Sequence, residues 1–103
     1  MTIIKNLAEK IKDELEDAED YAKRAIKHKD DDRELAQAFY ELSTEELRHA
    51  NLLHEQVVRF IKRHRAEKGE PPAAMQAVWD YLHEEHIEEA NEVRLYLEQF
   101  KNS

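Results

Sequence analysis

The stretch FYELSTEELRHANLLHEQVV, residues 39–58, decides the fold and raises the question of function. Its apolar residues recur every three or four positions, which is the spacing of one face of an α-helix. They are Phe39, Leu42, Ala50, Leu53 and Val57. Continuing this spacing through the gap leads to Glu46, and His49 follows at the edge of the same face. A carboxylate that is buried alone costs several kcal/mol, so Glu46 must be paired, protonated or bound to a metal ion.

Apolar periodicity predicts three long helices. The apolar face of the first helix contains Ile4, Leu7, Ile11, Leu15, Ala18, Ala22, Ala25 and Ile26. The second helix is predicted from about Arg33 to Glu67. Its apolar face contains Leu35, Phe39, Leu42, Ala50, Leu53, Val57, Phe60 and Ile61. The core face of the third helix contains Met75, Val78, Trp79, Leu82, Val93, Leu97 and Phe100.

Two short stretches separate these helices. In KHKDDDRE, residues 27–34, the apolar pattern stops, and the run of three aspartates from Asp30 can cap the start of the next helix. In EKGEPP, residues 67–72, Gly69 suits a helix C-terminus and the prolines suit the first turn of a new helix. Long helices with such short connections run antiparallel to their neighbours. The sequence therefore predicts one all-α domain over residues 1–103, whose four-helix packing a second chain completes.

Composition limits the classes of partner. Charged residues make up 39% of the chain, against roughly 25% in typical globular proteins, and the net charge is −8. Such an acidic surface repels nucleic acid and anionic membranes. No run approaches the ~20 apolar residues of a membrane span, and the lack of cysteine excludes disulfides, thiolate metal sites and cysteine nucleophiles. We therefore expect a soluble, cytoplasmic protein that binds neither nucleic acid nor membranes.

Glu14 is the counterpart of Glu46 on the first helix. It occupies a core-edge position there and lies 16 residues before Asp30, in the middle of the connection. Glu46 lies 16 residues after Asp30, so a helical hairpin places the two carboxylates at the same level. Glu16 and Glu19 are alternative candidates for the carboxylate of the first helix.

The third helix interrupts its apolar face at the corresponding level. His49 lies 20 residues before Gly69 and Glu89 lies 20 residues after it, with His86 one turn before Glu89. His86 and Glu89 are therefore auxiliary candidate ligands, although they could equally form a polar seam between subunits. Glu85 competes with Glu89 if the helix is slightly rotated.

Carboxylates and imidazoles in one dry layer form a metal-ligand set. Hard oxygen and borderline nitrogen donors suit iron or manganese, and zinc less specifically. Residues three apart on a helix face the same way, so Glu46 and His49 can bind the same pair of ions. The competing interpretation is a salt bridge or polar network that fixes helix register. No Lys or Arg occupies the centre of an apolar face in this layer, which favours metal.

Other aromatic and polar residues have simpler interpretations. Tyr21, seven residues after Glu14, is either a core residue or a phenol beside the ligands. The remaining four histidines are predicted to be solvated surface residues. They are His28, His54, His64 and His83.

Two segments resemble the ferritin-like superfamily, in particular rubrerythrin-like proteins and the short encapsulated ferritins. The first is ELEDAEDY, residues 14–21, in which a glutamate precedes a tyrosine by seven residues. The second is STEELRHA, residues 43–50, in which an acidic Glu-x-x-His motif is followed by alanine. The resemblance covers the first two helices, which make up more than half of the chain.

This resemblance implies roles for individual residues. Glu14 would be a metal ligand, Glu46 a bridging ligand and His49 a terminal ligand, with Tyr21 close to them. A full ferritin-like bundle needs four helices and two such half-sets, whereas this chain has one clear Glu-x-x-His motif. The resemblance therefore implies that two chains meet, that each donates Glu, Glu and His, and that two iron ions are shared across the dimer interface.

The resemblance also implies an activity, the oxidation of ferrous iron by oxygen. The chain departs from the family in its long third helix and in showing no tail that would target a shell. Without cysteine it also has no rubredoxin-type iron. We expect a ferroxidase-like, iron-binding homodimer or multiple of dimers. The rival interpretations are a metal-free oligomerisation or adaptor bundle, and a manganese- or zinc-binding bundle without catalytic activity.

Overall fold

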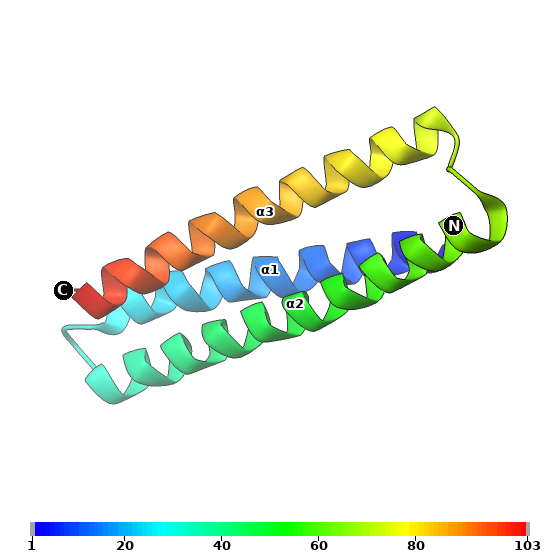
Figure 1. The fold of residues 1–103 in the computed structure, drawn as a ribbon. Coiled ribbons are helices and arrows are strands. Elements are labelled where there is room, and N and C mark those ends of the chain that lie inside the picture. Colours follow the sequence, from blue (N-terminus) through cyan, green and yellow to red (C-terminus); the bar gives the residue numbers. More distant parts are fainter. Residues whose placement is uncertain (1, 103) are drawn as a thin grey trace.

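The computed structural model describes residues 2–102, which form three long α-helices and contain no strand. α1 spans Thr2–His28, α2 spans Arg33–Lys68 and α3 spans Ala73–Asn102. Each helix runs antiparallel to the one before it, so that α1 and α3 are parallel (Figure 1). The Cα atoms fill an elongated volume of 55 × 18 × 17 Å. The prediction of an all-α fold with three long helices is confirmed.

The connections use the predicted capping residues. The side chain of Asp32 accepts a hydrogen bond from the backbone N–H of Leu35 at 3.1 Å, which satisfies one of the free donors at the start of α2. At the other end of α2, Gly69 has a positive φ of 77°, and its N–H donates to the carbonyl oxygen of Arg65 at 2.9 Å. Glycine fits this position because it has no Cβ to clash in the left-handed region.

α1 is the central helix of the molecule. It packs against both α2 and α3, whereas the backbones of α2 and α3 come close to each other at few places and these two helices meet mainly through long side chains. The buried residues of α1 follow the predicted apolar face. They are Ile4, Ala8, Ile11, Leu15, Ala18, Ala22 and Ala25. Leu7 and Ile26, also predicted for this face, are half-buried.

Small residues let α1 and α2 approach each other closely. The buried residues of α2 are Ala36, Ser43 and Ala50, which are spaced by seven. The Ser43 hydroxyl donates a hydrogen bond to the carbonyl oxygen of Ala18 at 2.7 Å, and neither residue is exposed. The prediction that Leu35 and Leu42 belong to the core is wrong, since they are 40% and 44% exposed. α3 packs elsewhere on α1, so this flank of α2 stays largely uncovered by the helices of residues 2–102.

α3 is anchored mainly by its C-terminal half. Its buried residues are Trp79, Val93, Leu97 and Phe100. The ring of Phe100 stacks on Tyr40 with 5.1 Å between ring centroids. The Lys29 ammonium, from the α1–α2 connection, donates a hydrogen bond to the carbonyl oxygen of Phe100. Both contacts tie the end of α3 to the hairpin of α1 and α2.

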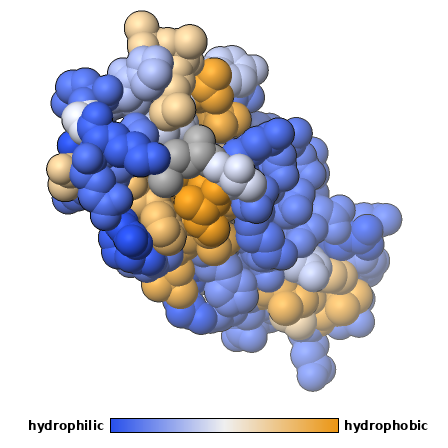
Figure 2. Space-filling model, turned by 90° about the vertical axis from the view of Figure 1, so that its right-hand side faces the viewer, coloured by the Kyte–Doolittle hydropathy of each residue, from blue (hydrophilic) through white to orange (hydrophobic). Residues whose placement is uncertain are grey.

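The N-terminal half of α3 is less well covered. Val78, predicted for the core face, is 56% exposed, and Leu82 is half-buried. In Figure 1 this part of α3 diverges from the other two helices. Figure 2 looks onto that end of the molecule and shows apolar side chains open to the outside between strongly polar surfaces. None of the helices within residues 2–102 is long and apolar enough to cross a membrane.

Candidate metal centre

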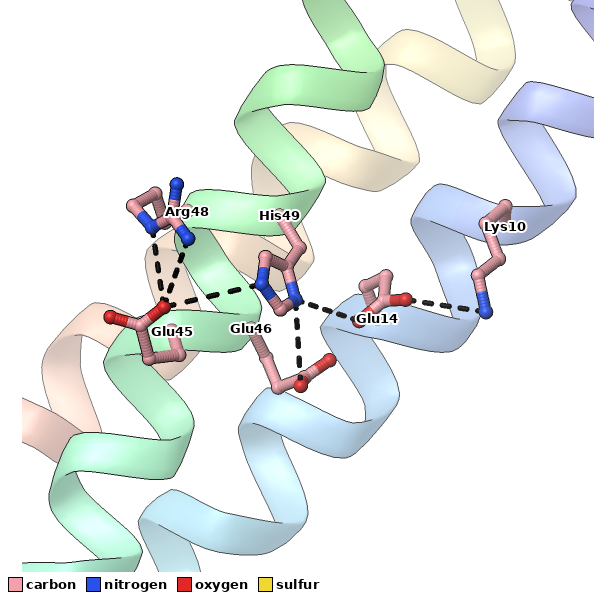
Figure 3. A network of polar contacts seen from close by, with 6 residues as sticks. All are labelled: Lys10, Glu14, Glu45, Glu46, Arg48 and His49. Atoms are coloured by element: carbon pink, nitrogen blue, oxygen red, sulfur yellow. Dashed lines mark hydrogen bonds and ion pairs between the residues drawn. The ribbon is translucent and has the colours of Figure 1, made fainter.

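Glu14 of α1 meets Glu46 and His49 of α2 halfway along the helix pair. One ligand atom from each residue lies within 4.8 Å of the other two. Nδ1 of His49 is 3.7 Å from Oε2 of Glu14 and 3.7 Å from Oε1 of Glu46. Figure 3 shows the three side chains pointing toward one another across the two helices. The prediction that a helical hairpin brings Glu14 and Glu46 to one level is confirmed.

The local packing of the helices explains this convergence. Glu14 lies one turn before Ala18, and Glu46 lies one turn after Ser43, which is hydrogen-bonded to Ala18. Because the two helices are antiparallel, both carboxylates lie on the same side of this buried contact, one turn away from it. Glu46 and His49 are three residues apart on one helix and so share a face.

The group is sheltered on one side and open on the other. The side chains of Glu14 and Glu46 are only 13% and 18% exposed, whereas the His49 side chain is 42% exposed. The predicted dry layer is therefore incomplete, because one flank of the group faces solvent. Two carboxylates held this close, with one accessible side, form an arrangement that a cation can reach and bind.

Three further residues surround the group. Nζ of Lys10 is 3.3 Å from Oε1 of Glu14, and Oε2 of Glu45 is 4.0 Å from Nε2 of His49. Arg48 donates to the same Glu45 oxygen from Nε and Nη2 at 3.2 and 3.1 Å (Figure 3). Sequence reasoning missed Lys10 and Glu45 because neither lies on an apolar face, although both sit four residues from a ligand on the same helix.

These neighbours leave the group with an excess of negative charge. Lys10 lies off the apolar face and its side chain is 58% exposed, so it balances one carboxylate only weakly. Glu45 is turned toward the Nε2 side of His49, while Nδ1 faces Glu14 and Glu46. A cation bound among the three ligands would use Nδ1 and leave Nε2 facing Glu45, a pattern typical of histidine ligands.

α3 does not supply ligands to this group in the described part of the chain. Glu89 interacts with Glu19 of α1, and the side chain of His86 interacts with the backbone of Ala8. Glu19 follows Glu14 by five residues, which places it roughly 140° further around α1. The predicted layer through all three helices is therefore not formed, because α3 packs on the other side of α1.

Tyr21 also lies outside the ligand group. It is half-buried and its ring stacks on Phe39 with 6.1 Å between centroids. Phe39 stacks in turn on His28, again at 6.1 Å. Of the four histidines predicted to be solvated, His83 is exposed, but His28, His54 and His64 are half-buried. His64 packs edge-on against Trp79 at 5.9 Å.

Glu89→Gln is expected to raise the melting temperature at pH 7.5. Oε1 of Glu89 is buried without a hydrogen-bond partner among the described residues. Burial raises the pKa of Glu89 most, followed by a hydrogen bond with Glu19 and then by the negative charges of Glu19, Glu92 and Glu16. Ionising a carboxyl whose pKa is raised in the folded state destabilises the protein. The free energy of unfolding therefore falls as the pH rises from the ordinary pKa of about 4.3 through the pKa of the folded state. Glutamine removes that penalty and keeps a donor for Glu19.

The measurement is thermal unfolding of both proteins, followed by circular dichroism between pH 4 and pH 8. The gain from Glu89→Gln should shrink toward pH 4, where Glu89 is protonated in the parent protein. A matched control is Glu88→Gln, which changes an exposed neighbour. A Glu89 variant that melts at or below the parent temperature at pH 7.5 would contradict this account.

No protein-family model, curated protein or solved structure matches this chain. What the chain can bind is therefore argued from the group itself. Two carboxylates and one imidazole are the donor set that iron, manganese and zinc share, and their atoms already face a common point. The residues present thus fit a divalent transition-metal ion.

Proposed function

We propose that this protein binds ferrous iron at Glu14, Glu46 and His49 and promotes its oxidation by oxygen. The observation that carries the proposal is the convergence of these three donors, from two helices, to within 4.8 Å. In this function ferrous iron is the substrate: each ion gives up one electron to oxygen and becomes ferric. The two carboxylates favour this change because they stabilise the additional positive charge.

A second copy of the chain completes the site in this proposal. Three protein donors are few for two metal ions, and the outer side of the group is open, with His49 42% exposed. Leu35 and Leu42 lie on the same flank of α2 and are exposed although they continue its apolar face. A twofold-related copy would cover these leucines and add its own Glu, Glu and His. The two α1–α2 pairs would then form the four-helix packing of a ferritin-like protein.

The resemblance of ELEDAEDY and STEELRHA to ferritin-like sequences supports iron over the other metals. Manganese or zinc could occupy the same donors. Zinc has no redox chemistry, so a zinc site would bind metal without consuming oxygen. A metal-free adaptor bundle would instead use the group as a polar contact between subunits.

The test is an anaerobic titration of metal-free protein with ferrous iron, followed by exposure to air. Oxygen uptake and ferric absorbance are followed, and light scattering gives the oligomeric state. We expect saturation at one ion per chain, which is one pair per dimer, and oxidation faster than in buffer. Glu46→Gln should lower the affinity by about a hundredfold or more, because removing even residues that only orient a ligand costs about 10–100-fold.

The matched control is Glu41→Gln, the same change at an exposed position on α2 outside the group. It should bind and oxidise iron like the parent protein. Iron binding unchanged in the Glu46 variant would exclude this group as the site. Binding that depends on Glu46 but gives no accelerated oxidation would leave a static metal site and contradict the ferroxidase activity.

A further inference from the structure

A groove runs between α2 and α3 on the side of α1 away from the metal centre. Ile4, Ala8, Ile11 and Leu15 of α1 line it, and all four are buried. The groove comprises a cavity of about 300 Å³ and a neighbouring one of about 140 Å³. The backbones of α2 and α3 are well separated here, and side chains bridge the seam between them.

Histidines from both helices meet in this seam. The rings of His54 of α2 and His83 of α3 stack at 5.0 Å between centroids, with 17° between their planes. His86, one turn after His83, lines both cavities as well and interacts with the backbone of Ala8. Two imidazolium rings in this face-to-face position would repel each other, so the stacked arrangement requires at least one of them to be neutral.

The charged groups around the histidines come from all three helices, and those of α1 are Lys12 and Glu16, which line a further cavity beside His86 together with Glu89 of α3. Those of α2 are Glu55, Lys62 and Arg65, and those of α3 are Asp80, Glu85 and Arg94. α1 contributes only apolar side chains to the lining of the two cavities. Glu55 and Glu85 favour protonation of His54 and His86, but burial opposes it more strongly.

The balance of these effects favours the neutral forms of His54 and His86. Burial lowers the pKa of His54, and the neighbouring His83 lowers it further. Burial also lowers the pKa of His86, against the interaction with Ala8, which raises it. A histidine with a lowered folded-state pKa stabilises the closed seam above its ordinary pKa of about 6.5 and loses this contribution as the pH falls below it.

The two halves of α3 are held very differently. Three of its four buried residues, Val93, Leu97 and Phe100, lie in the C-terminal half. The N-terminal half has only Trp79 as a buried residue, together with a hydrogen-bonded chain from Arg65 of α2 through Gln76 to Asp80. That chain lies on the surface and is open to competition by water.

We propose that acidification opens the seam: protonation of His54, which is stacked on His83 across the seam, drives residues 73–88 of α3 away from α2, while the C-terminal half of α3 stays anchored. The opening exposes the apolar floor on α1. It does not depend on the proposed metal function, because the metal centre lies on the other side of the α1–α2 pair.

Hydrogen exchange of the full chain at pH 7.5 and pH 5.5, measured by mass spectrometry and corrected for the intrinsic rate, tests this proposal. In the open state a histidine regains its ordinary pKa of about 6.5. Its protonation at pH 5.5 then shifts the equilibrium toward the open state by about tenfold. We expect the opening equilibrium of residues 73–88 to rise by about tenfold or more, while residues 91–102 keep their protection. In the His54→Gln/His83→Gln variant the rise should be about tenfold smaller. His28→Gln, at the opposite end of α1, should behave like the parent protein.

Equal protection of residues 73–88 at both pH values would overturn the proposal. So would a loss of protection that extends equally over all three helices, or a double variant with the same rise as the parent protein. If the double variant does not fold, His83→Gln decides, because this side chain is exposed whereas His54 is half-buried. A smaller rise in that variant supports the proposal, and an unchanged rise overturns it.

Discussion

Ser43→Leu is expected to lower the free energy of unfolding by on the order of 3 kcal/mol and to weaken the proposed iron binding. Ser43 is fully buried between α1 and α2, and its hydroxyl donates to the carbonyl oxygen of Ala18 at 2.7 Å. Leucine at this position overpacks the contact, which costs about 1–3 kcal/mol, and removes a hydrogen bond worth about 1 kcal/mol. Urea unfolding measures the stability.

The same substitution should act on the metal centre through the spacing of the helices. Glu46 follows Ser43 by one turn and faces Glu14 across the contact that leucine would widen. Interaxial distance depends on the side chains at the contact, so the ligand atoms would move apart. Ser43→Ala is the control, because it loses the hydrogen bond but keeps the small volume. It should cost about 1 kcal/mol and leave iron affinity unchanged. A leucine variant as stable as the alanine variant would refute the close-packing account.

Phe100→Ala is expected to lower the free energy of unfolding by about 3–5 kcal/mol, the range for truncating a large buried aromatic residue. Phe100 is 4% exposed and packs with the buried Ala25 and Ala36, so it joins α3 to both other helices. Its ring also stacks on Tyr40. Truncation leaves a cavity at the end of the molecule where fully buried residues of all three helices share one core cluster.

Urea unfolding again gives the magnitude, and hydrogen exchange locates the effect. Loss of protection should be greatest along α3, while iron binding at the α1–α2 pair should change much less than stability. Leu95→Ala is the matched control on the same helix, because Leu95 is 67% exposed and its loss should change stability by less than about 0.5 kcal/mol. Equal losses from the two substitutions would show that the end of α3 is not an anchor.

Local patterns determined most of the secondary structure. Helix periodicity predicted three long helices, and the acidic run before Arg33 and the glycine at position 69 predicted where α2 begins and ends. These features act within a few residues, through capping hydrogen bonds and backbone conformation, so a linear sequence contains them in full. The meeting of Glu14 with Glu46 and His49 was predictable for a related reason: a short connection fixes which levels of two antiparallel helices face each other.

The sequence by itself therefore determined the helices, their connections and the pairing of ligands across the first hairpin. Only the tertiary structure decided the rotation of each helix and the side of α1 on which α3 packs. Periodicity places a residue on a helix face but does not say which neighbour covers that face. For α2 the close contact selected the small residues Ala36, Ser43 and Ala50 and left Leu35 and Leu42 exposed. For α3 the packing directed His86 and Glu89 away from the metal centre. The small alanines of α1 allow both α2 and α3 to pack against it, and α3 took the side that does not carry Glu14.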